Sequence, residues 1–239
     1  MFSYSISDFV AFDKAVWLSM VGQYMVKWWW VAVLATAALL LYTVRWAASP
    51  SARTPGPVFL VLSVCWLWVA WEFHWHEHRV LNWAAGYWAL AFVAQAVLLA
   101  LVAALVRPGS HDDNIGLIDT VSHLRLSSVL AIVVGALLLP GLLAWSVDGA
   151  YPPGFEWFGL TPDATAVMTI LIVALWWDGS VWLRVLLSVL PVSSLLIATL
   201  LSTGLAIYTT GIMMAATGLT VIFIARASRL SATPRVVAG

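Results

Sequence analysis

Charged residues are scarce in this chain. Only 9% of its 239 residues are Asp, Glu, Lys or Arg, against roughly 25% in a soluble domain. The 11 basic and 11 acidic side chains leave no net charge, and no basic stripe is present, which argues against nucleic acid as a partner. Hydrophobic residues make up 63% of the chain. A soluble core of this length cannot bury so many, so we expect the lipid bilayer to be the main partner of this surface.

Cysteine occurs once, as Cys65. A disulfide within the chain and a cysteine-based zinc or iron–sulfur site are therefore excluded. No lysine lies inside an expected membrane span, which excludes a retinal Schiff base. The chain also lacks the G-x-x-x-x-G-K-[ST], H-E-x-x-H and G-x-S-x-G patterns. These patterns indicate nucleotide hydrolysis, zinc proteases and serine hydrolases respectively.

Long apolar runs dominate what remains. Hydropathy predicts an all-α, polytopic transmembrane helical bundle of about seven spans, forming a single domain over residues 1–239. The expected spans are residues 28–46, 58–75, 84–106, 127–145, 164–177, 181–201 and 205–225. The boundary at Ser202-Thr203-Gly204 is the weakest, and merging the last two spans would leave six. Many of the 16 tryptophans lie near span ends, as interfacial belts require.

The segment before the first span has a pattern of its own. Within residues 5–23, Phe9, Phe12, Val16 and Met20 recur at helical spacing. This pattern predicts an amphipathic helix that lies in the membrane interface as part of an N-terminal segment, residues 1–27. The alternative is a simple extension of the first span.

The basic residues predict an orientation. One side of the expected bundle carries Arg45, Arg53, Arg107, Arg125, Arg184, Arg226, Arg229 and Arg235, and the other carries Lys14, Lys27 and Arg79. Basic residues gather on the cytoplasmic side of a membrane protein. We therefore expect a multi-pass protein of the inner (plasma) membrane, with the N-terminus outside and the tail of residues 226–239 in the cytoplasm.

Titratable groups are densest just after the second apolar run, in E-F-H-W-H-E-H. On a helix, His74 and His78 share one face, and Glu77 lies three residues from His74 on the same side. Two imidazoles and a carboxylate are suitable ligands for copper or zinc. The spacing predicts a metal site of His74, Glu77 and His78, with His76 as a further candidate and Glu72 as a proton or ion relay. The alternative is an interfacial cluster without a metal.

A second constellation follows the fourth span, in the sequence Y-P-P-G-F-E-W-F-G. It is rigid, aromatic and acidic, and on the expected topology it shares the outer face with the histidines. Tyr151, Glu156 and Trp157 are candidates for a lid over a cavity there. The alternative is a loop that re-enters the interface as an anchor.

Three features in this order carry a resemblance to a family. They are Phe73-His74-Trp75 with Asn82 and Ala84-Ala85, the loop from Tyr151-Pro152 to Phe158-Gly159 with Thr161-Pro162, and two closing apolar spans. The chain resembles a family of bacterial multi-pass integral membrane proteins catalogued only as a domain of unknown function. The resemblance extends from the region of Phe9 to about Ile224, and it implies a fold but no activity.

Only part of the family pattern carries over to this chain. His74 and Trp75 match it, whereas His76, Glu77 and His78 stand at positions that are apolar in the family. A metal site that uses all three histidines would therefore be special to this chain. The family's cysteine near Thr161-Pro162 is absent, which argues against thiol chemistry.

These features favour a protein that is not an enzyme and that binds or translocates a cation or small solute through an outer-face His/Glu site. One alternative is an accessory structural subunit of a larger membrane complex, or a homo-oligomer, because partner-facing and lipid-facing aromatic residues look alike in sequence. A second alternative is a metal-dependent membrane enzyme, which requires a cavity and an open coordination position.

Overall fold

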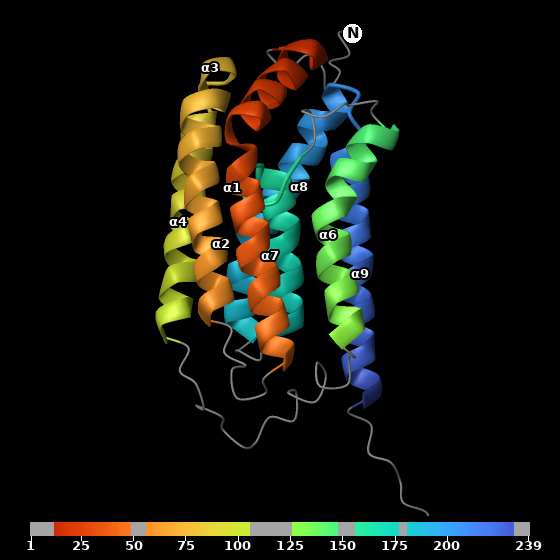
Figure 1. Ribbon diagram of the computed structural model, residues 1–239. Helices are drawn as coiled ribbons and strands as arrows, with labels where there is room; N and C mark the ends of the chain where they lie inside the picture. The colour runs from red at the N-terminus through yellow and green to blue at the C-terminus, as the bar shows by residue number, and fades with distance from the viewer. Residues whose placement is uncertain (1–11, 49–55, 106–125, 148–155, 177–180, 232–239) are drawn as a thin grey trace, which may run out of the picture.

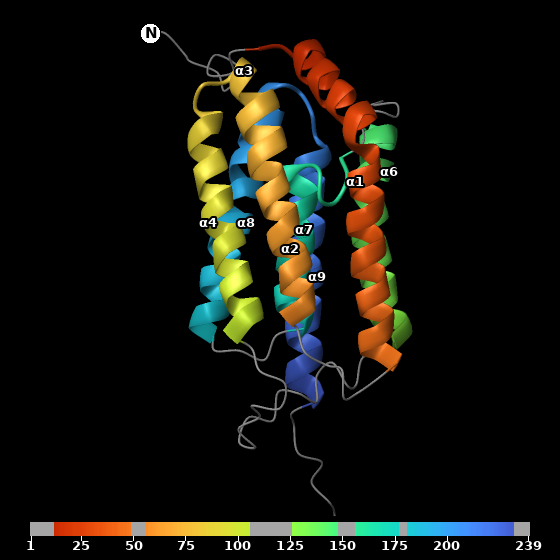
Figure 2. The same cartoon turned by 60° about the vertical axis from the view of Figure 1, so that its left-hand side comes forward.

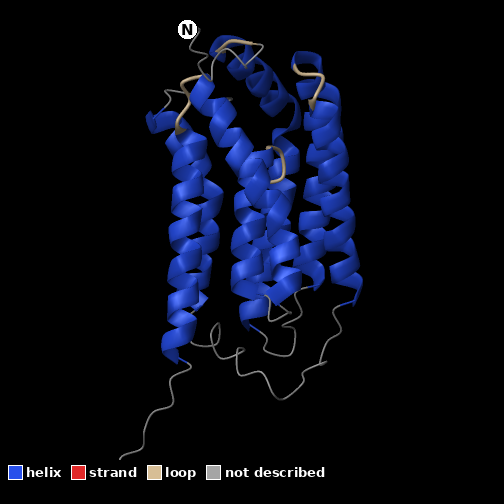
Figure 3. Cartoon of the chain, turned by 180° about the vertical axis from the view of Figure 1, so that it is seen from behind, coloured by secondary structure: helices blue, strands red, loops and turns tan. Residues whose placement is uncertain are grey.

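The computed structural model describes residues 12–48, 56–105, 126–147, 156–176 and 181–231, and all regular structure in these ranges is helical. Figure 1 shows long helices that run alternately down and up, and Figure 3 shows the same bundle from behind. The helices are α1 (Lys14–Ala48), α2 (Gly56–Trp68) with its continuations η3 (Val69–His78) and α3 (Arg79–Leu81), α4 (Ala85–Leu105), α6 (Leu126–Val147), α7 (Pro162–Trp176), α8 (Val181–Gly204) and α9 (Thr209–Ser231).

The helices suit a membrane by length and composition. Four stretches are long and apolar enough to cross one: Lys14–Arg45, Gly56–Leu81, Ala85–Leu105 and Val181–Gly204. Shorter apolar helices cover Leu130–Leu143, Pro162–Leu175 and Thr209–Ile222. Large apolar side chains such as Leu34, Leu90 and Trp182 face outward, as contact with lipid requires. The prediction of an all-α membrane bundle is confirmed, with four to seven spans.

The N-terminal part of the chain differs from the predicted arrangement. Helix α1 is continuous over 35 residues, so the described part of the expected interfacial helix and the first span form one element. No proline interrupts this stretch, so nothing forces the helix to end. At about 50 Å, α1 is longer than the hydrocarbon core is thick. Figures 1 and 2 show its first turns leaning across one end of the bundle.

The boundary between the last two helices is a tight turn. Helix α8 ends at Gly204, α9 begins at Thr209, and the Ile207 N–H donates to the carbonyl of Ser202 at 2.8 Å. Ala206 has a φ of 55°, a left-handed conformation that a helix interior does not contain. The last two helices are therefore separate, as the reading with seven helices expects.

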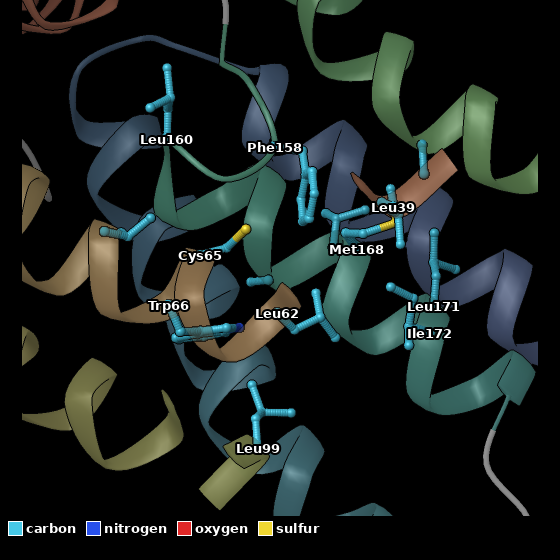
Figure 4. Packing of buried hydrophobic residues seen from close by; sticks show 14 of the residues in the cluster. Leu39, Leu62, Cys65, Trp66, Leu99, Phe158, Leu160, Met168, Leu171 and Ile172 are labelled. Atoms are coloured by element: carbon cyan, nitrogen blue, oxygen red, sulfur yellow. The ribbon is translucent and has the colours of Figure 1, made fainter. Parts of the chain in front are cut away.

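Apolar packing fills the middle of the bundle. Figure 4 shows Leu62, Cys65 and Trp66 of α2 facing Met168 and Ile172 of α7, and all five side chains are buried. The buried indole N–H of Trp66 donates to the Thr169 hydroxyl at 2.8 Å. This bond satisfies a polar group that would otherwise be costly in an apolar core.

The segment that leads into α7 enters this core. Phe158, Leu160 and Thr161 are buried, and Figure 4 shows Phe158 and Leu160 beside the packed helices. The backbone polar groups find partners: the Gly159 N–H donates to the Thr165 hydroxyl at 3.0 Å, and the Tyr24 hydroxyl donates to the Leu160 carbonyl at 3.2 Å. Irregular backbone is tolerated at membrane depth only under such conditions.

Glycine is required where this segment turns. Gly159 has a φ of 82°, and a Cβ atom on it would lie 2.8 Å from the Cβ of Ala35 and 3.3 Å from the Sγ of Cys65. A larger residue would be strained by its backbone conformation and would collide with two helices. The close approach lets residues 156–161 pass between α1 and α2.

Candidate functional site

The histidine-rich stretch forms a π-helix rather than the expected α-helix. The element η3 spans ten residues, and the Arg79 N–H donates to the carbonyl of His74, five residues back. The π-helix is rare and is found disproportionately at functional sites. A π-helix holds more residues in each turn than an α-helix does, so residues three apart diverge while residues four apart stay on one face. The helix type therefore decides which predicted ligands can meet.

His74 and His78 face each other. Their Nδ1 atoms lie 3.4 Å apart, and each side chain is only 5% exposed. In a hydrogen bond between them, one Nδ1 donates and the other accepts, so two neutral rings present one Nε2–H and one bare Nε2. Neither Nε2 atom has a hydrogen-bond partner among the described residues. The pair thus carries unused hydrogen-bonding and ligand capacity.

Aromatic rings hold the pair in place. The ring of His74 lies 4.5 Å from that of Phe92 and 5.3 Å from that of Phe73, measured between centroids. The ring of His78 lies 5.3 Å from that of Trp17 in an edge-on contact. Edge-on packing of this kind stabilises aromatic contacts beyond the area they bury. The imidazoles therefore have little freedom to rotate.

The two histidines line a cavity of about 60 Å³, which we call the histidine cavity. It lies between η3, residues 156–163, the last turns of α8 and the start of α1, and Glu156 and Asp163 contribute carboxyl groups to it. None of the described residues that line it is lysine or arginine. A space of this size holds a few water molecules or one small solute.

Asp163 belongs to this cavity and lies in the first turn of α7. It is 6% exposed, and its Oδ2 accepts a hydrogen bond of 3.0 Å from the Thr210 hydroxyl. The Ser202 hydroxyl in turn donates to Thr210 at 3.3 Å. Oδ1 has no hydrogen-bond partner within the described ranges. The helix N-terminus favours negative charge at this position, but one carboxyl oxygen remains without a partner.

The start of α1 covers the cavity. Phe12 and Trp17 stack with a centroid separation of 5.5 Å, and both line the cavity. The Lys14 ammonium donates to the carbonyl of Ala206 at 3.3 Å, which ties the first turn of α1 to the turn between α8 and α9. The leaning end of α1 therefore covers the cavity, and its Lys14 is bound to a carbonyl.

The structure brings only part of the predicted metal set together. Glu77 turns away from the histidine pair: its side chain is 30% exposed, and its Oε1 lies 3.7 Å from the Lys27 ammonium. His76 is exposed, with Nδ1 2.9 Å from the Trp71 carbonyl. Glu72 is half-buried and is not among the residues that line the histidine cavity. The wider turn of the π-helix explains why Glu77, three residues after His74, leaves that face.

Among the described residues, no group of three or more His, Cys, Asp and Glu side chains is arranged to hold a metal ion. The copper or zinc site and the relay role of Glu72 therefore stay predictions.

The predicted lid residues have different positions. Glu156 lines the histidine cavity. Trp157 is 42% exposed, and its carbonyl accepts hydrogen bonds from the N–H groups of Leu160 and Thr161 at 3.1 Å. Tyr151 lies outside the described residues. The described end of the loop is thus built into the bundle rather than laid along its surface.

Sequence reasoning missed the contribution of Asp163. It assigns no role to this residue, although the run T-P-D before an apolar stretch is typical of a helix start with an acid in its first turn. That pattern locates the residue on α7. Nothing in the sequence indicates that this turn lies beside histidines more than 80 positions earlier.

No family model, curated protein or solved structure matches this chain. The resemblance to a family of uncharacterised membrane proteins therefore stays a prediction.

Proposed function

We propose that this protein is an integral membrane protein that binds a small cation or cationic solute in the histidine cavity. The observation that carries the proposal is the combination of lining groups: two carboxyl groups and two imidazoles, with no lysine or arginine among the described lining residues. Oδ1 of Asp163, buried and without a hydrogen-bond partner in the described part of the chain, is the strongest single indication.

Electrostatics supports a cation as the occupant. An ionised carboxylate in an apolar interior is costly unless a charge or hydrogen bonds compensate for it. The Thr210 hydroxyl donates to one oxygen of Asp163, so a bound cation would compensate the charge at the other oxygen. Trp17 and Phe73 also line the cavity, and aromatic rings can attract cations.

The apolar packing next to the cavity bears on how the site would be used. Leu62, Trp66, Met168 and Ile172 are fully buried in the adjoining core, and the Thr169 hydroxyl among them is already engaged by Trp66. A site of this kind suits binding, or transport in which access alternates between the two ends. An open pore would need a continuous polar path.

We also propose that the cavity faces the outside of the plasma membrane. Lys14, Lys27 and Arg79 belong to the cavity end, whereas the last turn of α1 at the opposite end carries Arg45, and α9 also ends there with Arg226 and Arg229. The larger basic set supports a cytoplasmic opposite end. A C-terminal green fluorescent protein fusion should fluoresce, and a C-terminal alkaline phosphatase fusion should be inactive. The reverse pair of results would contradict this orientation.

Binding can be tested by thermal stability of the full chain in detergent. Chlorides of sodium, potassium, ammonium and methylammonium are compared with the chloride of N-methylglucamine, which is too large for the cavity and controls for ionic strength. At least one small cation should raise the melting temperature, since ligand at 100 times its Kd adds about 2.7 kcal/mol. Asp163→Asn with Glu156→Gln should abolish the rise. No rise above the control, or one that survives both substitutions, would contradict the proposal.

A further inference from the structure

We infer that His74 and His78 form a two-imidazole chelate for a transition-metal ion in the wall of the histidine cavity. The inference rests on the proposed function and names one class of cation for the same site. It requires neither Glu77 nor His76, both of which lie away from the pair.

The spacing of the two nitrogens carries the inference. Two imidazole nitrogens at about 2.0–2.1 Å from one tetrahedral metal lie about 3.4 Å apart. The Nδ1 atoms of His74 and His78 are separated by 3.4 Å. An N–H···O hydrogen bond is usually shorter, at about 2.7–3.2 Å. The separation of the pair therefore matches a shared ion and is at the long end for a direct hydrogen bond.

The surroundings suit such an ion. Both rings are nine-tenths or more buried and packed by Phe73, Phe92 and Trp17, so a ligand pair would be held ready at little entropic cost. The carboxyl groups of Glu156 and Asp163 in the same cavity add negative charge. Metal ligation by both Nδ1 atoms would leave each ring proton on Nε2, and neither Nε2 is engaged within the described residues.

The number of ligands predicts weak, exchangeable binding. Among the described residues no third His, Cys, Asp or Glu completes a preformed group, so water or a solute in the cavity would fill the remaining positions. Structural zinc sites have four protein ligands, and sites that act on a substrate keep a position open. Imidazole nitrogen favours Cu²⁺ and Zn²⁺ over Ca²⁺ and Mg²⁺, with Cu²⁺ bound most tightly.

Copper titration with electron paramagnetic resonance tests the chelate. The probe is Cu²⁺ added to the full chain, purified in detergent without a polyhistidine tag. We expect one specific Cu²⁺ per chain with the spectral signature of two imidazole nitrogens. His74→Gln and His78→Gln should each weaken binding on the order of tenfold or more. His76→Gln is the matched control from the same helix, and it should leave the spectrum and affinity unchanged.

Two results would overturn the chelate. One is a wild-type spectrum without two imidazole nitrogens, which requires no variant to fold. The other is loss of the signal in His76→Gln but not in His78→Gln, which would place the copper on the surface. Melting curves without metal show whether the glutamine variants remain folded.

The outcome also separates this inference from the proposed function. If methylammonium or an alkali cation stabilises the protein through Asp163 while Cu²⁺ gives no two-nitrogen spectrum, the cavity binds cations but the histidines are not a metal chelate. If Cu²⁺ binds as expected while the monovalent cations have no effect, the chelate stands and the broader cation site does not.

Discussion

Two regions of this bundle differ in how their polar groups are paired, although the same helices contribute to both. Around Leu62, Trp66 and Met168, side chains are apolar and fully buried, and the one indole N–H there has a hydroxyl partner. About two to three turns further along α2 and η3, His74 and His78 line a cavity, and their Nε2 atoms have no hydrogen-bond partner among the described residues. In the first region the indole N–H has a partner within the protein, whereas in the second two ring nitrogens and one carboxyl oxygen have none among the described residues. Packing in the first region maintains the fold, and the second region is where the proposed cation would bind.

The largest loss of stability should follow from creating a cavity in the apolar region. Trp66→Ala removes a fully buried ring that contacts Phe92 at 4.3 Å between centroids and leaves Thr169 without its donor. We expect a loss of about 3–5 kcal/mol in the free energy of unfolding, measured by denaturation in detergent. Trp182→Ala is the matched control, because Trp182 is 83% exposed and its replacement should cost little. Equal losses of stability in the two variants would contradict the view that the apolar region maintains the fold.

The next largest loss of stability should follow from a substitution in the segment that joins the two regions. Gly159→Ala adds a Cβ atom 2.8 Å from that of Ala35 at a φ of 82°. We expect a loss of about 1–3 kcal/mol from backbone strain, with more from the collision, measured as a fall in melting temperature. Gly135→Ala is the control: a Cβ atom there meets nothing within 4 Å, and in a helix alanine is favoured over glycine. A Gly159→Ala protein as stable as wild type would mean that residues 156–161 do not lie between α1 and α2.

A smaller effect is expected within the cavity wall. Thr210→Val removes the hydroxyl that donates to Asp163 at 3.0 Å. Losing one partner of a buried hydrogen bond costs about 1–3 kcal/mol, and cation binding should weaken because the carboxylate is less well positioned. Thr203→Val is the control, since this exposed hydroxyl donates to the Thr199 carbonyl of its own helix. Unchanged stability and binding in Thr210→Val would rule out the hydroxyl's role.

The smallest effect is predicted at the surface beside the cavity. Glu77→Gln breaks an exposed contact with Lys27, and such pairs contribute at most about 1 kcal/mol. Stability and cation binding should both stay close to wild type, as measured by melting with and without the cation. A large loss of cation binding in this variant would mean that Glu77 takes part in the site, which would contradict its separation from the histidine pair.

Much of the fold could be predicted because hydropathy acts locally along the chain. The apolar runs predict the helices, and the weak boundary at Ser202 to Gly204 is resolved by the structure, in which the last helix is separate. The pairing of His74 with His78 could also be predicted, since four-residue spacing preserves one face in α- and π-helices alike. Glu77 could not be placed, because the sequence gives no sign of the π-helix that turns it away.

The rest of the site depends on contacts between distant segments. Asp163 joins the histidines only because residues 156–161 pass into the bundle, which depends on Gly159 fitting against Ala35 and Cys65. The cover of the cavity depends on α1 continuing past the expected membrane boundary. Both are outcomes of packing between helices, and a single sequence contains no periodic pattern that predicts them.

The central claim is that imidazole and carboxyl groups act together in one cavity, and a double-mutant cycle tests it most directly. The quantity is the cation-induced rise in melting temperature, converted to binding free energy, for wild type, His78→Gln, Asp163→Asn and the double variant. Groups that share one bound cation should be coupled by about 0.5–3 kcal/mol, so the second substitution should cost less once the first is present. Effects that add to within about 0.3–0.5 kcal/mol would mean that the two side chains do not serve a common ligand.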